Sequence, residues 1–598
     1  SALTNVQIPA SVEVIGERAF MGTDIRKVAF GENLTAIGTE AFYQCESLAE
    51  ITFAEQSVLD TIGDVAFGGC KAVKEIVLPD TVRVLGSYAF VGCYSLESVY
   101  ISAGLEKMGD YAFSANGKLT TVTFGNGAKE IGDMAFFTPV DDGNLAKGFY
   151  YNTSLKTIKI PDSIERIGKF AFAGNTVIKV VNLNGVKVID DYAFHYATAL
   201  HTVNITSALE RVGKGAFIGS SLRMMELKDV KYIDDQAFLG TDIGNTKNTL
   251  SLTNVIEIGM GAFYNCANLP FTIDMPNVVK IGDMAFYTQS TSKISSVNLG
   301  KKLTLLGGAV FVNSSLSTIT LPATLKEIGA PAFAACMALR EIKIDSKNKV
   351  FFVENNGLYK RLENGTYELV AVPNALSNNG RKSTDPLFED YTKIHEDYKQ
   401  LTPYKIKDGT SRISTWAMGH CQLIHAVEIP ASVQTIGAYA FWNLGYQVLL
   451  NDQELAQTSR APYAKFIFKG LQAPALEGEY TEESTALDQM YVNFVYNMGY
   501  LMSDMIIPVN AKGFESLLYA YCFYDKVYSE ELMESDTQKL LDWLTALDID
   551  ALTADDKATV TEMNMIYFMM RQSQKAFISE ELQAKLVAAV DKLADVQV

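Results

Sequence analysis

The sequence of 598 residues predicts a β-rich repeat solenoid of about 16 repeats, each about 23 residues long, followed by a small all-α domain. Three observations lead to this prediction. A hexapeptide of the form Ile-Gly-x-x-Ala-Phe recurs through most of the chain, a Leu-x-x-Val-x-Ile segment precedes many copies, and the apolar period becomes helical beyond about residue 470. Self-similarity at a fixed period is typical of arrays in which each unit packs on its neighbours.

The hexapeptide supplies one large apolar residue per repeat. It begins at Ile15-Gly16-x-x-Ala19-Phe20, and a degenerate copy, Ile413-Ser414-x-x-Ala417-Met418, precedes the last one at Phe441. A residue repeated this regularly is expected to point into a shared interior, because one repeat alone cannot bury a core. The structural-core prediction names the phenylalanines Phe42, Phe67, Phe90, Phe113, Phe217 and Phe263.

Each repeat has three predicted parts. The Leu-x-x-Val-x-Ile segment alternates apolar and polar residues at its end, as a strand with one buried face does. A turn with proline, as in Pro79-x-Thr81-Val82, ends the strand because proline cannot donate to a ladder. The Gly-x-x-Ala-Phe segment is predicted to be one helical turn, because its first position also holds Asp190, Asp234 and Ser414, which share with glycine a preference for helix N-caps. A requirement for positive φ at that position is the alternative, and it fits serine poorly.

The predicted domains are a solenoid of 14 repeats over 1–343, an insertion with a β-hairpin over 344–410, the last two repeats and a capping strand over 411–470, and an acidic all-α domain over 471–598. The last region has 22 Asp+Glu and 8 Lys+Arg, a net charge of -14 out of -18 for the chain. Asn364-Gly365 between two apolar runs predicts the hairpin turn. The helices are expected over 483–506, 511–528, 535–547, 553–572 and 579–595, with Ser579 as an N-cap.

Six of the seven cysteines follow the repeat's Phe or Met by three positions: Cys45, Cys70, Cys93, Cys266, Cys336 and Cys421. Other repeats hold Thr, Asn or Ser there, so the position is interpreted as a structural rung facing the interior, where a free buried cysteine is normal. A disulfide among Cys45, Cys70 and Cys93, which stand on consecutive repeats, is the alternative.

No motif in the sequence indicates catalysis, a metal or a cofactor. His420-Cys421-x-x-x-His425 has ligand residue types, but zinc needs three or four converging ligands and no others are evident. His195 and His201 are expected to be surface residues. With five histidines and no paired carboxylates, acid–base chemistry has no evident site, so the prediction is a protein that is not an enzyme.

The repeat unit Leu-x-x-Val-x-Ile-Pro-x-Ser-Val-x-x-Ile-Gly-x-x-Ala-Phe-x-x-Cys resembles the BspA-type leucine-rich repeat of bacterial surface proteins. The resemblance covers 3–343 and 411–441, and 344–373 is similar to a hairpin of that family. It implies a leucine-rich-repeat solenoid, located outside the cell or on its surface, that binds other macromolecules and has no catalytic residues. The helical region loosely resembles helical repeats of Gram-positive surface proteins, which suggests a spacer.

The candidate binding residues are aromatic. On the strand segments the outward residues are small and polar except for Tyr100, and two insertions carry the others: Phe149, Tyr150, Tyr151, Phe388, Tyr391 and Tyr398. Aromatic residues on loops of a rigid scaffold are favoured interface anchors. Packing of these rings back onto the solenoid is the alternative.

The net charge of the chain limits the classes of partner that are expected. A net charge of -18 argues against nucleic acid and anionic membrane surfaces, and no stretch reaches 18 consecutive apolar residues, so no membrane insertion is expected. The chain opens directly on a repeat, so it is interpreted as a mature or trimmed fragment. The predicted function is a non-catalytic secreted or cell-surface adhesion protein whose partner is an unknown macromolecule, foremost a host extracellular-matrix or surface protein. The alternative is the targeting or scaffold part of a larger surface enzyme.

Overall fold

The computed structural model describes the following residues: 4–137, 155–206, 209–244, 249–266, 268–290, 292–331, 333–375, 403–421, 424, 426–437, 439–441, 444, 464–469, 475–476, 503–506, 538–553, 556, 559–560, 563, 567 and 578–594. The chain divides into two compact units. The first comprises Ser1–Ser315 with Glu327–Gly329, and the second comprises Leu316–Lys326 with Ala330–Val598.

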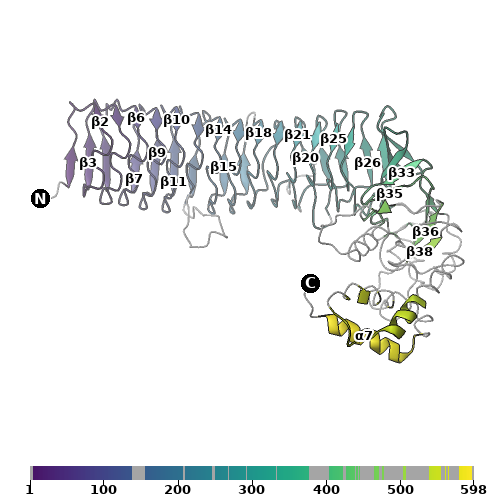
Figure 1. Cartoon of the computed structure of the whole chain (residues 1–598). Helices are drawn as coiled ribbons and strands as arrows, with labels where there is room; N and C mark the ends of the chain where they lie inside the picture. Colours follow the sequence, from purple (N-terminus) through teal and green to yellow (C-terminus); the bar gives the residue numbers. More distant parts are fainter. Residues whose placement is uncertain are drawn as a thin grey trace. The chain divides into compact units, whose positions relative to one another are not determined.

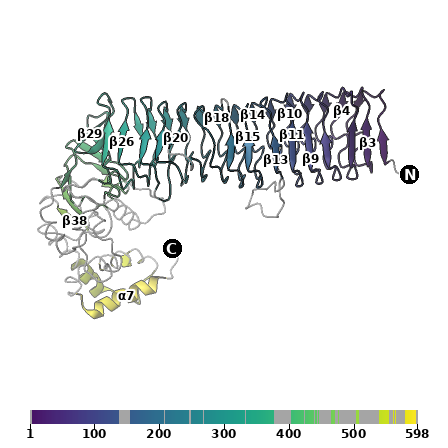
Figure 2. The same ribbon diagram turned by 180° about the vertical axis from the view of Figure 1, so that it is seen from behind.

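The first unit is a solenoid in which most coils contribute one strand to each of two parallel ladders (Figures 1 and 2). The longer strands come from the Leu-x-x-Val-x-Ile segments: β1 (Asn5–Gln7), β3 (Lys27–Phe30), β5 (Glu50–Phe53), β7 (Glu75–Val77), β9 (Ser98–Ile101), β11 (Thr121–Phe124), β13 (Thr157–Lys159), β15 (Val180–Asn182), β17 (Thr202–Asn204), β20 (Thr249–Ser251), β22 (Thr272–Asp274) and β24 (Ser296–Asn298). They form sheets of order β1-β3-β5, β13-β11-β9-β7, β15-β17 and β20-β22-β24. The repeat solenoid predicted from the sequence is confirmed.

The second ladder consists of two-residue strands that end in the repeat's Ile, Leu, Val or Met. They are β2 (Val14–Ile15), β4 (Ala36–Ile37), β6 (Thr61–Ile62), β8 (Val84–Leu85), β10 (Lys107–Met108), β12 (Glu130–Ile131), β14 (Arg166–Ile167), β16 (Val188–Ile189), β18 (Arg211–Val212), β19 (Tyr232–Ile233), β21 (Glu257–Ile258), β23 (Lys280–Ile281), β25 (Leu305–Leu306) and β27 (Glu327–Ile328). The strands on the two sides of the insertion 138–154 pair directly, β11 with β13 and β12 with β14. Both ladders therefore continue past this insertion, although the second is interrupted one coil earlier, between β10 and β12.

The Gly-x-x-Ala-Phe segments form consecutive hydrogen-bonded turns in place of the predicted helical turn. In the first copy the Ala19 N–H donates to the Gly16 carbonyl oxygen at 3.4 Å, and Arg18 has a φ of 55°. A positive φ at the third residue is typical of a type II turn and does not occur in a right-handed helix. The residue before the alanine has a positive φ in later copies too, as at Glu40, Val65, Tyr88, Tyr111 and Met134. The positive φ thus falls two positions after the glycine, and not at the glycine itself.

The repeated phenylalanines stack on one another through the interior of the first unit. The rings of Phe42 and Phe67 lie 5.1 Å apart with 3° between their planes, and those of Phe67 and Phe90 repeat this geometry. The six phenylalanines named as structural core are all buried, with exposed fractions of 0–1%. The ring spacing is close to the separation of neighbouring strands, so each ring packs against the coils before and after it.

Several glycines lie where neighbouring coils approach closely. A Cβ added to Gly127 would lie 1.6 Å from the carbonyl oxygen of Ala103 on the preceding coil. We expect Gly127→Ala to destabilise the protein by about 3 kcal/mol or more, because the backbones of two coils must separate. Gly117→Ala is the control, since nothing lies within 4 Å of its added Cβ, and should change stability by less than about 1 kcal/mol. Urea denaturation of the two variants checks this, and equal midpoints would contradict the close approach.

The described residues of the second unit form three sheets. The first pairs β26 (Thr318–Leu321) with β28 (Glu341–Ile344); the second has the order β29 (Phe351–Glu354), β30 (Gly357–Arg361), β31 (Tyr367–Ala371), β33 (Thr410–Ile413), β35 (Thr435–Ile436), β37 (Ala475–Leu476); and the third has the order β32 (Tyr404–Lys405), β34 (Ala426–Ile429), β36 (Ala464–Phe468), β38 (Ser503–Ile506). The hairpin predicted at Asn364-Gly365 joins the antiparallel strands β30 and β31, and Gly365 has a φ of 81°.

The strands extend beyond the boundary that the charge pattern suggested near residue 470. The expected capping strand over 463–468 is β36, but β38 pairs in parallel with it and β37 pairs with β35. The end of the helix expected over 483–506 is therefore a strand, at Ser503–Ile506. An acidic composition determines the surface charge of a segment, but it does not indicate where strand pairing ends.

Helices occur near the C-terminus, at 538–546 and at α7 (Glu580–Ala594), close to two of the predicted ranges. The Ser579 Oγ accepts a hydrogen bond from the Leu582 N–H at 3.3 Å, as expected for an N-cap. Asp556 accepts from the Thr553 N–H at 2.8 Å, as the acidic residue of a capping box does at the start of a helix. Leu540, Leu544, Val560, Leu586 and Ala589 are among the apolar side chains that pack together there.

Candidate binding surface

The cysteines form rungs that bond to backbone oxygens of the neighbouring coil. The Cys45 Sγ lies 3.0 Å from the carbonyl oxygen of Phe20, and the Asn116 side chain donates to the carbonyl oxygen of Phe90 in the same way. All six cysteines at this position are buried free thiols, so the disulfide alternative is wrong. Burial raises the pKa to about 12 for three of them, Cys93, Cys266 and Cys421. Such thiols stay protonated, and a protonated thiol is a poor nucleophile.

His195 is buried, which contradicts the expectation of a surface residue. The residue is 5% exposed, and its ring meets the rings of Phe170, Tyr192 and Tyr196 edge to face, at centroid distances of 6.5, 5.4 and 4.5 Å. Burial lowers the pKa of His195 to about 4, because the imidazolium would lose its hydration there. His201 is half-buried, and its Nδ1 lies 2.8 Å from the Thr202 Oγ1.

Tyr100 is the one candidate binding aromatic among the described residues. It is half-buried, and its hydroxyl donates to the Asp80 carboxylate at 2.9 Å, so it is tied to the preceding coil. The other six candidates lie outside the described residues: Phe149, Tyr150, Tyr151, Phe388, Tyr391 and Tyr398. Of the parts of the chain that are described, no cluster of three or more His, Cys, Asp or Glu is arranged to hold a metal, and no helix has the length and hydropathy for a membrane span.

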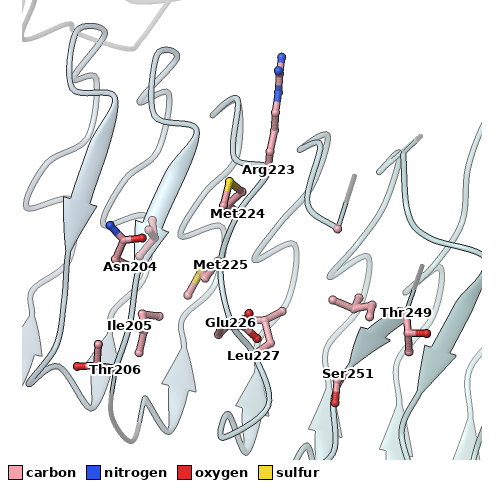
Figure 3. Close-up of a pocket in the computed structure, with 13 residues that line it drawn as sticks. Asn204, Ile205, Thr206, Arg223, Met224, Met225, Glu226, Leu227, Thr249 and Ser251 are labelled. Carbon is pink, nitrogen blue, oxygen red and sulfur yellow. The ribbon is translucent and has the colours of Figure 1, made fainter. Parts of the chain in front are cut away.

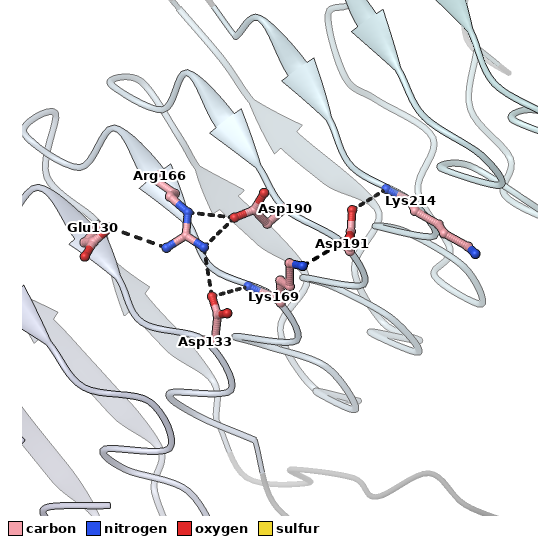
Figure 4. Close-up of polar contacts among 7 residues, drawn as sticks. All are labelled: Glu130, Asp133, Arg166, Lys169, Asp190, Asp191 and Lys214. Carbon is pink, nitrogen blue, oxygen red and sulfur yellow. Dashed lines mark hydrogen bonds and ion pairs between the residues drawn. The ribbon is translucent and has the colours of Figure 1, made fainter. Parts of the chain in front are cut away.

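Carboxylates connect successive coils along the side of the solenoid that the Gly-x-x-Ala-Phe turns form, here called the turn edge (Figure 4). The Asp133 Oδ1 accepts from the Lys169 N–H at 2.9 Å, and the Asp191 Oδ1 accepts from the Lys214 N–H at 3.0 Å. Arg166 pairs with three carboxylates from two other coils: Glu130 at 3.4 Å, Asp133 at 2.9 Å and Asp190 at 2.6 Å. The acids that follow the glycine position therefore satisfy amides of the next coil, which is a structural role.

The ladder of longer strands is interrupted between β5 and β7 and between β13 and β15, and it is interrupted again between β17 and β20. The coil between them contributes one isolated bridge, Thr202 with Met224, in which the Val203 N–H donates to the Met224 carbonyl oxygen at 2.8 Å. On its other side this coil bonds to the next at two points, from the Gly244 N–H to the Arg223 carbonyl oxygen and from the Asn254 N–H to that of Lys228, both at 3.3 Å. Among described residues, no backbone hydrogen bond joins 224–227 to 249–251 between these two points.

The interruption coincides with extra sequence at the start of the next strand. In a regular repeat Val28 follows Ile25 by three positions, whereas Leu250 follows Ile243 by seven. The four additional residues, 245–248, lie outside the described residues. They separate Gly244, which keeps its bond to Arg223, from Thr249, which begins β20.

A groove of about 350 Å³ occupies the interruption (Figure 3). Met224, Met225 and Glu226 lie between Asn204 on the preceding coil and Ser251 on the following one. Met224 is 51% exposed, whereas Met225 is buried. The groove, defined by Asn204, the coil 223–227 and β20, thus combines an exposed thioether, polar side chains and strand backbone, and its volume lies at the lower end of the range for ligand sites.

A family model for the BspA type leucine-rich repeat region matches the chain in six copies, over residues 1–60, 56–139, 144–269, 244–357 and 392–457. These ranges take in more than half of the chain. The chain belongs to the BspA-type leucine-rich-repeat family. Among curated proteins none matches it.

Several solved structures are similar to this BspA-type chain. One is a leucine-rich repeat protein from Bacteroides ovatus, with 22% identity and a TM-score of 0.37, covering 57% of this chain and 92% of that one. Another is a leucine rich cell surface protein from Faecalibacterium prausnitzii, with 17% identity and a TM-score of 0.21, covering 89% of this chain and 90% of that one. A third is the pneumococcal vaccine antigen PcpA, with 16% identity and a TM-score of 0.25, covering 55% and 79%.

The BspA-type repeat also explains why sequence reasoning missed the groove. The family pattern describes only the residues that all repeats share. The groove arises where one repeat departs from that pattern. The available signal was the seven-position spacing from Ile243 to Leu250. A second missed feature is a set of stacked aromatic pairs on the turn edge, Tyr88 with Tyr111 at 4.6 Å and Phe170 with Tyr192 at 4.8 Å.

Proposed function

We propose that this chain is a non-catalytic secreted or cell-surface adhesion protein whose repeat scaffold binds host or microbial macromolecules. The observation that carries the proposal is the groove beside β20 on the strand side of a rigid solenoid. Binding sites favour concave surfaces held by regular elements, because little ordering entropy is then lost on binding. Membership of a family of repeat proteins with a protein-binding role supports the same function.

The foremost partner class is a host extracellular-matrix or surface protein. The six described thiols are buried and not accessible to a partner, and the carboxylates at the turn edge bond to amides and Arg166. Among the described residues, the groove is therefore the feature best suited to contact with a partner. The insertions with Phe149, Tyr150, Tyr151, Phe388, Tyr391 and Tyr398 stay proposed contributors to the binding surface.

The test is a solid-phase binding assay of the full chain on immobilised host matrix proteins and on a glycan array, together with a panel of hydrolase substrates. We expect saturable binding to at least one matrix protein and no turnover. A deletion of residues 141–151 that keeps the melting temperature should weaken binding if that insertion contributes. Turnover without saturable binding would instead favour a part of a surface enzyme and overturn the proposal.

A further inference from the structure

We propose that the groove binds an extended polypeptide segment, which adds as a strand to the edge of β20 that faces the groove. This inference rests on the proposed function, because it names the partner class and the binding mode of that same site. The groove is lined by Asn204, Met224, Met225, Glu226, Thr249 and Ser251.

The backbone of β20 has the edge that such a strand requires. In a regular pair of coils, the Lys27 N–H donates to the Thr4 carbonyl oxygen at 3.2 Å, and the Ala29 carbonyl oxygen accepts from the Ile8 N–H at 2.8 Å. Thr249 and Ser251 hold the positions of Lys27 and Ala29 in their own coil. Their N–H and carbonyl groups therefore face the groove.

The other edge of β20 is already in use. Leu250 pairs with Ile273 of β22, and the Leu252 N–H donates to the Asp274 carbonyl oxygen at 2.8 Å. Alternate residues of a strand bond to opposite neighbours, so the groups of Thr249 and Ser251 are not consumed by β22. Among the described residues none of the groove-side coil, 224–227, bonds to them.

The backbone N–H and C=O groups of Thr249 and Ser251 determine which class of ligand fits the groove. An extended polypeptide presents N–H and C=O groups at the spacing of a strand, about 3.3 Å per residue, and so matches the edge of β20 over its three residues. A glycan carries hydroxyls without this repeat. Peptide addition to a free edge gains main-chain hydrogen bonds, and side-chain contacts then add selectivity.

The side chains favour an occupant with an apolar residue. Met224 is 51% exposed at the groove, and the thioether adapts to apolar groups of different shape. A regular strand of this chain, β11, alternates polar residues with Val122 and Phe124. A segment of that pattern places one set of side chains against Met224 while its backbone pairs with β20.

The probe is a labelled synthetic peptide with the sequence of residues 118–125, Lys-Leu-Thr-Thr-Val-Thr-Phe-Gly, titrated with the full chain by fluorescence anisotropy. Ser251→Pro removes the N–H that faces the groove, whereas Ser251→Ala keeps it. We expect the peptide to bind, Ser251→Pro to weaken it at least tenfold, and Ser251→Ala to change it by less than twofold. Melting temperatures of both variants verify folding. Met224→Asp, which leaves the backbone intact, is the second variant and should also weaken binding.

Equal affinities for Ser251→Pro and Ser251→Ala would overturn the inference, as would retention of affinity by a peptide N-methylated at alternate residues. Absence of peptide binding, or saturable binding of an oligosaccharide that Met224→Asp abolishes, would overturn it as well. The same variants are assayed on the immobilised matrix proteins. If matrix binding persists while the peptide fails, strand addition is wrong and the proposed function stands; if neither binds, both fail.

Discussion

Replacing Phe217 by alanine should lower the free energy of unfolding by about 3–5 kcal/mol. The ring is fully buried and stacks between Phe194, at 5.4 Å with 1° between planes, and Phe238, at 5.5 Å with 4°. Truncation removes both contacts and leaves a cavity that two coils, fixed by ladders on either side, cannot close. Urea denaturation followed by circular dichroism measures the loss.

Two controls accompany this substitution. Phe217→Leu keeps much of the volume and should cost about 1–2 kcal/mol. Tyr94→Ala removes a ring that is 55% exposed and should change stability by less than about 0.5 kcal/mol. A denaturation curve for Phe217→Ala that matches that of Tyr94→Ala would contradict the role of the stacked rings as the core.

The second large effect is acid destabilisation through His195. Burial lowers the pKa of its imidazole to about 4 in the folded chain, whereas the unfolded value is about 6.5. Between these two values the unfolded chain binds a proton that the folded chain does not, so stability falls as the pH falls from about 6.5 to about 4 and levels off below. The shift corresponds to about 3 kcal/mol.

The measurement compares the free energy of unfolding at pH 7 and pH 4.5 for the native chain and for His195→Gln, which cannot titrate. Carboxylates also titrate in this interval, so the difference between the two pH slopes isolates the histidine. We expect the variant to lose less stability on acidification. Identical slopes would mean that His195 binds its proton equally well in the folded and the unfolded chain, and would contradict the lowered pKa.

Much of the fold follows from the sequence because its information is local and periodic. The strand segments, the buried phenylalanines and the small interior residue such as Cys45 each recur at a fixed place in the repeat, so one physical argument applies to every coil. The hairpin at Asn364-Gly365 was predictable for the same reason, since a two-residue turn signal stands between two apolar runs.

What the sequence did not reveal depends on contacts between coils. A Gly-x-x-Ala-Phe segment reads equally well as a helix start or as a turn, and the choice is made by hydrogen bonds to the next coil, such as that from the Phe20 N–H to the Ala41 carbonyl oxygen. His195 was misassigned although its counterparts Val91, Ala173 and Ile218 are apolar, which indicates a sheltered position. The groove needs the relative placement of β17 and β20, which one departure in spacing does not specify.

The direct pairing of β11 with β13 and of β12 with β14 has a consequence for how such chains diversify. From Phe136 to Phe172 the chain is 13 residues longer than a 23-residue repeat (36 − 23), yet the strands before and after the extra residues still pair on both ladders. The paired strands that stabilise the solenoid and the residues that lengthen this repeat therefore lie in different parts of the chain. Evolution can therefore change the sequence and length of an insertion between two coils without changing the strand ladders.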